Sequence, residues 1–211
     1  MPRIKKWVVA KAHAWKWVQD ADRIYVATRF LFWKGFPFEF ALLGAHAIEL
    51  YLKAYLIHRT GKYPIAHDLA KIYRECMGLD DFFNDEALTG NFLLQPLPDN
   101  PQNWAHLPWS HLTWTQYTRA LRYPESLHPG QSPHGAIICT GYASCNRGGT
   151  CWTLDCIARF TRQAIPRPKQ ERDAIDNFLN GTGDIWAPSL PQGDLEDIRE
   201  SFLRGNQFFS S

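Results

Sequence analysis

The sequence predicts an all-α protein, built as an antiparallel up-and-down helical bundle. Three observations support this fold class. Apolar residues recur at helical spacing in several long segments, links containing Gly or Pro separate these segments, and no convincing strand is visible apart from a few residues around 136–140. Hydrophobic residues make up 45% of the 211 residues, and nine Trp with thirteen Phe predict a bulky aromatic core.

The first half of the chain predicts a helical hairpin. Residues 8–34 keep roughly helical apolar spacing, and residues 37–60 are apolar nearly all round. Gly35 ends the first helix, Pro37 is placed to open the second, and Gly61 ends it. Because the link between them is short, the two helices must run antiparallel.

The rest of the chain predicts shorter helices separated by two long irregular stretches. We expect helices over residues 66–78, near 81–88, and over 109–121, 150–164, 168–181 and 194–205. The irregular stretches are an insertion at about 80–108, rich in Pro, Asn and Asp, and a Cys-rich loop at about 130–150. We therefore expect a helical bundle over residues 1–166 and a C-terminal helical extension over residues 167–211.

Charge is distributed unevenly along the chain. Residues 1–62 carry eleven Lys and Arg against four Asp and Glu, whereas residues 168–211 carry four against eight. The net charge of +2 does not by itself indicate a nucleic-acid-binding protein. The basic front predicts either a surface that faces phosphate groups or a surface onto which the acidic tail folds back.

The sequence also predicts a cytoplasmic protein. The basic start of the chain resembles no secretory signal, because Lys11 and Lys16 interrupt its apolar stretch. No run approaches the ~18 uninterrupted apolar residues that span a bilayer, so we expect no membrane segment. The five Cys are then expected to be mostly reduced.

Polar residues lie along one side of the second predicted helix. His46, Glu49 and Lys53 follow one stripe, and Glu49 precedes Lys53 by four residues, which is the favourable order for an ion pair. A carboxylate in the middle of an otherwise apolar helix needs a cation from another element as well, because burying an unpaired charge is costly.

Three short motifs follow one another in an order that carries a family resemblance. They are Glu49-x-x-Leu52-Lys53-Ala54, then His67-Asp68-Leu69, then Arg122-Tyr123-Pro124. Their order and spacing resemble one branch of the HEPN family, the higher eukaryote and prokaryote nucleotide-binding domains. The resemblance covers roughly residues 8–165. It implies a bundle of four or five antiparallel helices that forms a homodimer.

The resemblance also implies roles for the polar residues of these motifs. Glu49 is expected to pair with Arg122, His67 to cap or pack at the start of its helix, and Asp68 to lie in the first turn, where its negative charge suits the helix dipole. The structural polar cluster predicted in this way consists of His46, Glu49, Lys53, His67, Asp68 and Arg122. The implied partners are RNA, a nucleotide or a protein such as a nucleotidyltransferase.

A different branch of the family implies catalysis. Its members carry Arg-x(4–6)-His and resemble metal-independent RNases, in which His moves a proton and Arg stabilises charge on the phosphate. Arg122 and His128 satisfy this spacing, although Pro124 and Pro129 predict a turn where the catalytic members have a helix. If the protein is an enzyme, we expect a metal-independent endoribonuclease that needs no cofactor.

Four Cys within eighteen residues, Cys139, Cys145, Cys151 and Cys156, raise the question of a zinc site. Their spacing lacks the paired Cys-x(2–4)-Cys hooks of usual structural sites. We therefore favour small apolar packing residues over metal ligands.

Basic residues suggest two further sites. The N-terminal segment interleaves bases with Trp, so it predicts either a surface that stacks nucleic-acid bases or Trp residues in the core with Lys residues in solvent. Gly148 and Gly149 beside Arg147 predict either an anion-binding loop or a plain helix start with Thr150 as N-cap, and we favour the helix start. The nucleic-acid-binding candidates are Lys5, Lys6, Lys11, Lys16 and Arg147.

Three classes of function follow from these patterns. The one we favour is a non-catalytic HEPN-like binding and dimerisation module for a nucleotide, a nucleic acid or a protein. The second is the metal-independent RNase with Arg122 and His128, in a toxin or defence setting. The third is a structural protein-interaction domain with an exposed aromatic surface.

Overall fold

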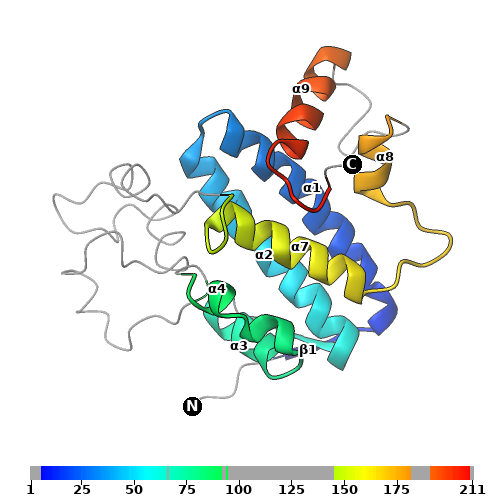
Figure 1. The fold of residues 1–211 in the computed structure, drawn as a ribbon. Coiled ribbons are helices and arrows are strands. Elements are labelled where there is room, and N and C mark those ends of the chain that lie inside the picture. The colour runs from blue at the N-terminus through cyan, green and yellow to red at the C-terminus, as the bar shows by residue number, and fades with distance from the viewer. Residues whose placement is uncertain (1–5, 66, 92–93, 95–144, 182–190, 210–211) are drawn as a thin grey trace, which may run out of the picture.

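The computed structural model describes the chain except for residues 1–5, 66, 92–93, 95–144, 182–190 and 210–211 (Figure 1). Its elements are β1 (Lys6–Val8), η1 (Lys11–His13), α1 (Ala14–Trp33), α2 (Pro37–Thr60), β2 (Lys62–Pro64), α3 (Leu69–Met77), η2 (Asp81–Asn84), α4 (Glu86–Thr89), α7 (Thr150–Ala164), α8 (Ala174–Leu179) and α9 (Gln192–Leu203). The described residues are mostly helical and hold one two-stranded sheet, which confirms the all-α fold class.

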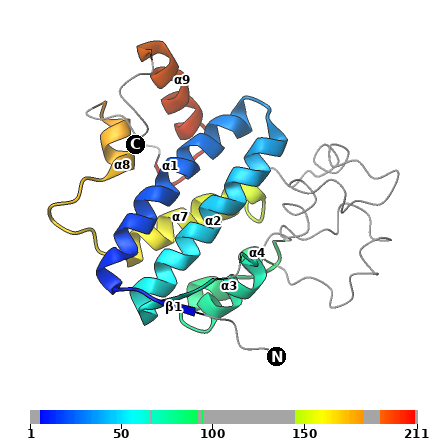
Figure 2. The same cartoon turned by 180° about the vertical axis from the view of Figure 1, so that it is seen from behind.

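The predicted hairpin is formed by α1 and α2, which lie side by side and antiparallel (Figure 2). Helix α2 ends as expected at Gly61, whose φ of 69° is left-handed and whose N–H donates to the Ile57 carbonyl at 2.8 Å. Glycine adopts this conformation without the steric cost of a Cβ, so it terminates the helix at this residue.

The predicted start of the first helix was wrong. Helix α1 begins at Ala14, and residues 6–8 form β1, which pairs antiparallel with β2 so that Trp7 faces Tyr63. The Val9 N–H also donates to the Gly61 carbonyl at 2.9 Å. The partner of β1 follows the end of α2, a long-range pairing that local spacing does not reveal, so the expectation of no strand outside 136–140 was wrong as well.

Helix α3 begins a little later than predicted. Asp68 is its N-cap, with a carboxylate that accepts from the Lys71 N–H at 3.2 Å, so Asp68 does not lie in the first turn. A capping Asp satisfies an N–H group that has no partner within the helix. The single helix expected near 81–88 is split into η2 and α4. The predicted 109–121 helix and the strand-like stretch at 136–140 lie outside the described residues.

Helix α7 spans Thr150–Ala164, as predicted. Its N-cap is Gly149 and not Thr150, which is instead the first helical residue and is buried. Of the predicted Cys-rich loop, the structure describes only the residues from Cys145 onwards.

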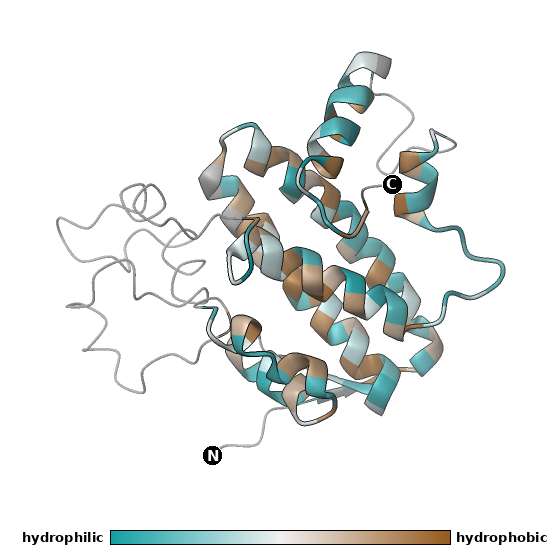
Figure 3. Ribbon diagram, in the orientation of Figure 1, coloured by the Kyte–Doolittle hydropathy of each residue, from teal (hydrophilic) through white to brown (hydrophobic). Residues whose placement is uncertain are grey.

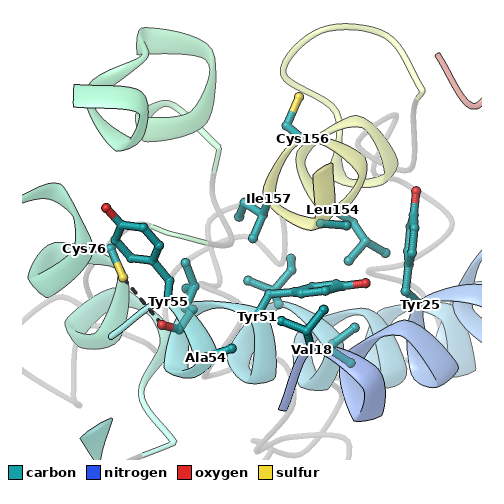
Figure 4. Close-up of a cluster of buried hydrophobic side chains, with 14 of the residues drawn as sticks. Val18, Tyr25, Tyr51, Ala54, Tyr55, Cys76, Leu154, Cys156 and Ile157 are labelled. Carbon is teal, nitrogen blue, oxygen red and sulfur yellow. Dashed lines mark hydrogen bonds between the residues drawn. The ribbon is translucent and has the colours of Figure 1, made fainter. Parts of the chain in front are cut away.

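The core lies between α1, α2 and α7, and all three helices carry many hydrophobic residues among polar ones (Figure 3). Leu154 and Ile157 of α7 lie over Tyr51 of α2 and Val18 of α1 (Figure 4). Aromatic rings extend this core towards η2, where the Phe82 and Phe160 rings stack with centroids 3.9 Å apart.

The C-terminal tail packs onto the hairpin. Helices α8 and α9 lie against α1 (Figure 2), and Ile175, Phe178 and Phe202 are fully buried in the same core as the bundle. Full burial of one Phe side chain is worth roughly 1.5–3 kcal/mol, so the tail contributes to the stability of the bundle. Among the described residues no helix is long and apolar enough to cross a membrane.

Candidate functional site

A pocket of about 550 Å³ opens at the end of the bundle where α1 begins and both α2 and α7 end. Its lining residues come from three segments that are far apart in sequence: Lys11, Ala12, Trp15, His58, Arg59, Ile165, Pro166 and Pro168. Trp15 and Ile165 are buried, so they form an apolar floor, whereas Lys11 and Arg59 are exposed at its edge. A concave site with an apolar floor and a few polar groups is the usual form of a small-molecule site.

The pocket is positively charged. Its lining includes Lys11, His58 and Arg59 but no Asp or Glu. Partial burial lowers the pKa of His58, and the neighbouring Arg59 and Lys11 lower it further. A neutral His beside two fixed cations indicates a positive local potential, which an anion would relieve.

Three residues of the predicted polar cluster meet where α2 faces the start of α3, namely Glu49, Lys53 and His67. Glu49 Oε1 accepts from Lys53 Nζ at 2.7 Å and lies 2.8 Å from His67 Nδ1. Glu49 and Lys53 are 8% and 3% exposed, whereas His67 is exposed. Lys53 also lies 5.6 Å from the centroid of the Tyr63 ring, and His46 belongs to the same helix. Lys53 thus supplies a cationic partner for the buried carboxylate, and a ring nitrogen of His67 supplies a second polar one.

Arg122 and His128 lie outside the described residues. The expected Glu49–Arg122 pair and the expected catalytic pair therefore both stay predictions.

Two buried ion clusters between α1 and α7 were missed in the sequence analysis. In the first cluster, the Asp22 carboxylate accepts from Arg162 and, at 2.6 Å, from the Tyr51 hydroxyl. In the second, which we call the Arg29 cluster, Arg29 donates to Asp155 at 2.9 Å. Both Asp22 and Arg29 are fully buried.

The spacing of these ions follows from helix geometry. Asp22 and Arg29 are seven residues apart on α1, and Asp155 and Arg162 are seven apart on α7. Seven residues are close to two helical turns, so each pair lies on one face of its helix. Because Asp22 meets Arg162 while Arg29 meets Asp155, α7 runs antiparallel to α1. This matched spacing of opposite charges in two apolar helices is the signal that could have revealed the clusters.

Burial dominates the electrostatics of both carboxyl groups. It raises the pKa of Asp22 to about 7, against the opposing effects of Arg162 and of the Tyr51 hydrogen bond. It raises the pKa of Asp155 to about 7, against the opposing effects of Arg29 and of the hydrogen bond from Tyr25. Removing a carboxylate from water disfavours its charged form, and a paired cation only partly restores that form.

The comparison with known protein families bears on the hairpin. The HEPN domain model matches residues 14–90, which span α1 to α4 and contain Glu49 and His67. The HEPN resemblance is confirmed over these residues. No curated protein and no solved structure gives a significant match. The HEPN match supports a nucleotide-binding or RNase-type module in general terms, and it does not separate a binding role from a catalytic one.

The nucleic-acid-binding candidates that the structure describes do not all gather on one surface. Lys6 pairs with Glu75 at 2.8 Å, and Arg147 pairs with Asp85 at 3.2 Å. Lys11 lines the pocket, Lys16 is exposed on α1, and Lys5 lies outside the described residues. Among the described candidates, only Lys11 lines the pocket together with His58 and Arg59.

The three N-terminal Trp residues differ in burial. Trp15 is 3% exposed and belongs to the core. Trp17 packs on Tyr63 with ring centroids 4.7 Å apart, whereas Trp7 in β1 is 58% exposed. Two of the three rings thus contribute mainly to packing.

The Cys residues after the matched region also take different positions. Cys145 and Cys151 lie beside Arg29. Cys156 lies on the side of α7 that points away from Tyr51 and Val18 (Figure 4). Cys139 lies outside the described residues. Among the residues that the structure describes, no group of three or more His, Cys, Asp or Glu could hold a metal ion.

Proposed function

We propose that the chain is a non-catalytic HEPN-type binding module whose pocket takes the phosphate of a nucleotide or of single-stranded RNA. The observation that supports this proposal is the convergence of Lys11, His58 and Arg59 above an apolar floor, with no carboxylate in the lining. Two fixed cations attract phosphate, and the flat apolar floor of Trp15 and Ile165 suits a base or a sugar.

The basic residues of the pocket differ in their contacts with other residues of the protein. Arg59 approaches Asp80 at 4.0 Å and the Leu79 carbonyl at 3.5 Å, so a substitution of Arg59 also removes internal contacts. Lys11 and His58 have no such contact to another described residue. Lys11→Ala is therefore the cleaner test of ligand binding.

The test is binding of a short fluorescein-labelled single-stranded RNA, followed by fluorescence anisotropy, with ATP as a competitor. We expect Lys11→Ala and Arg59→Ala each to weaken binding several-fold and to reduce the salt slope of the binding constant by about one. Arg23→Ala is the matched control for Arg59→Ala, because Arg23 is an exposed Arg of α1 outside the pocket. Equal affinities in all variants would refute the proposal.

The protonation of His58 gives a second readout. A bound phosphate removes part of the positive field that lowers the pKa of His58. We therefore expect the NMR titration midpoint of His58 to rise when ATP is added, and to stay unchanged in Lys11→Ala at the same ATP concentration.

The metal-independent RNase with Arg122 and His128 is the alternative, and the Arg-x(5)-His spacing of these residues favours it. End-labelled single-stranded RNA incubated with the protein in EDTA tests it, beside His128→Ala. Cleavage that disappears in a folded His128→Ala protein would replace the binding module by an RNase. No cleavage, or cleavage that survives His128→Ala, would retain the binding module.

The partners of the module are a separate question. HEPN domains commonly dimerise and bind nucleic acids. A homodimer, a nucleotidyltransferase partner and a structural role in protein interaction stay predictions for this chain.

A further inference from the structure

Two Cys sulfur atoms share one buried cation in the Arg29 cluster. Arg29 Nη1 lies 2.8 Å from Cys151 Sγ and 3.6 Å from Cys145 Sγ, and it donates to Asp155 at 2.9 Å. The Cys145 sulfur also accepts a hydrogen bond from the Cys151 thiol. Both Cys are free thiols.

The short loop between the two Cys makes this approach feasible. Gly148 has a φ of +86°, a left-handed conformation that glycine adopts without strain, and Gly149 is the N-cap of α7. The backbone therefore reverses direction between Cys145 and the first turn of the helix, where Cys151 lies.

The two thiols have unequal environments. Cys151 is fully buried, whereas Cys145 is partly exposed. The hydrogen bond from Cys151 lowers the pKa of Cys145 to about 6, and Arg29 contributes to this shift against the effect of burial. The same hydrogen bond, together with burial and Asp155, raises the pKa of Cys151 well above its ordinary value. At neutral pH, Cys145 is therefore the thiolate and Cys151 the thiol.

We propose that Cys145 and Cys151 form a thiol-oxidation site, in which a peroxide oxidises Cys145 and Cys151 then closes an intramolecular disulfide. The Cys145 thiolate attacks one peroxide oxygen, the O–O bond breaks, and with hydrogen peroxide the hydroxide that leaves takes up a proton to become water. Cys145 is then a sulfenic acid. The Cys151 sulfur attacks the Cys145 sulfur, and the hydroxyl group leaves as water with the Cys151 proton. In sum, two thiols and one hydrogen peroxide give one disulfide and two waters.

The site lies against the C-terminal tail. Arg29 also donates to the backbone carbonyls of Phe202 and Arg204. A Cβ placed on Gly205 would lie 3.8 Å from Cys145 Sγ and 3.3 Å from the Trp33 ring, so the tail passes close to this thiol. Cys145 stays partly exposed beside the tail, so hydrogen peroxide can reach its sulfur atom.

The experiment uses the full chain, reduced and then exposed to hydrogen peroxide, with mass spectrometry of tryptic peptides. Trypsin cleaves after Arg147, so Cys145 and Cys151 fall on separate peptides that only a disulfide can join. Cys139 shares the Cys145 peptide and Cys156 shares the Cys151 peptide, so the test is done in Cys139→Ser/Cys156→Ser protein that circular dichroism shows to be folded. We expect a linked peptide pair, lighter by two hydrogens and separated by dithiothreitol.

Two further variants divide the steps. Adding Cys151→Ser should abolish the link and leave a sulfenic acid on Cys145 that dimedone traps, whereas adding Cys145→Ser should leave no dimedone adduct. Iodoacetamide should alkylate Cys145 with a half-maximal rate near pH 6, whereas an ordinary thiol has a pKa near 9. No linked pair in the folded protein, or a link between two chains only, would overturn the proposal.

Discussion

The two ion clusters between α1 and α7 are built alike but hold the tail in different ways. In each, an Asp accepts from an Arg of the other helix and from a Tyr hydroxyl, which comes from Tyr51 for Asp22 and from Tyr25 for Asp155. Arg162 extends to the carboxylate of Asp173, the N-cap of α8, at 2.6 Å. Arg29 instead donates to the backbone carbonyls of Phe202 and Arg204 at the end of α9, and it lies beside the sulfur atoms of Cys145 and Cys151.

The difference shows which interactions attach each end of the tail to the bundle. The Arg162 end is fixed by charge, since one guanidinium lies between the two carboxylates of Asp22 and Asp173. The Arg29 end is fixed by hydrogen bonds to main-chain atoms, with Cys145 and Cys151 beside them. Both ends contain a carboxyl group whose pKa burial raises to about 7, and only the Arg29 end also contains Cys residues that oxidation can change.

The largest expected effect comes from removing either arginine. Breaking a buried ion pair leaves an uncompensated charge and costs about 3–5 kcal/mol of unfolding free energy. We expect Arg162→Met to reach the upper end of this range, because it leaves two carboxylates facing one another. Arg29→Met leaves one carboxylate and two carbonyls. Urea unfolding followed by circular dichroism measures both.

Arg23→Met is the matched control for these variants. Arg23 is exposed on α1, and its one ion pair with a described residue is to Asp20, three residues away, at 2.9 Å. Substitutions at such sites usually change stability by less than about 0.5 kcal/mol. A loss below about 1 kcal/mol in Arg162→Met would mean that the cluster does not anchor the tail.

A smaller effect is the pH dependence of the Asp22 carboxyl group. Burial raises the pKa of Asp22 from 3.8 to about 7 in the folded protein. A group with a raised folded pKa stabilises the fold most below its unfolded pKa, and this contribution is lost as pH rises through the folded pKa. We therefore expect the unfolding free energy of the wild type, relative to Asp22→Asn, to fall as pH rises from about 4 to about 7.

Urea unfolding at a series of pH values measures this difference. Asp20→Asn is the control, because Asp20 is an exposed carboxylate on the same helix, and its difference from the wild type should show a weaker pH dependence. If the unfolding free energy of the wild type relative to Asp22→Asn instead increased with pH, Asp22 would stay ionised beside Arg162.

The features of the fold that the sequence predicts correctly are those whose sequence signal lies within a single segment. Gly61 and Pro37 mark the ends of α2, and apolar spacing marks α7, so these helices were predicted at their observed bounds. The pairing of β1 with β2 is a contact between distant segments, so local spacing does not reveal it. The two ion clusters also join distant segments, and their one sequence signal is the matched spacing of opposite charges on α1 and α7. Lys11 was predicted as a ligand-binding residue, but its pocket partners His58 and Arg59 belong to the opposite end of the hairpin sequence.

The smallest expected effect concerns a third contact between α1 and the tail. Lys34 pairs with Asp197 of α9 at 2.7 Å, and the two side chains are 38% and 46% exposed. Exposed ion pairs contribute about 0–1 kcal/mol, because water and salt screen them and long side chains lose entropy. Lys34→Ala should therefore lower the unfolding free energy by less than about 1 kcal/mol, and high salt should abolish the difference. If Lys34→Ala instead lowered the unfolding free energy as much as Arg29→Met does, the exposed Lys34–Asp197 pair would hold α9 as strongly as the buried Arg29 cluster. The contacts of Arg29 with the tail, beside the two Cys residues, would then not be the main attachment of α9.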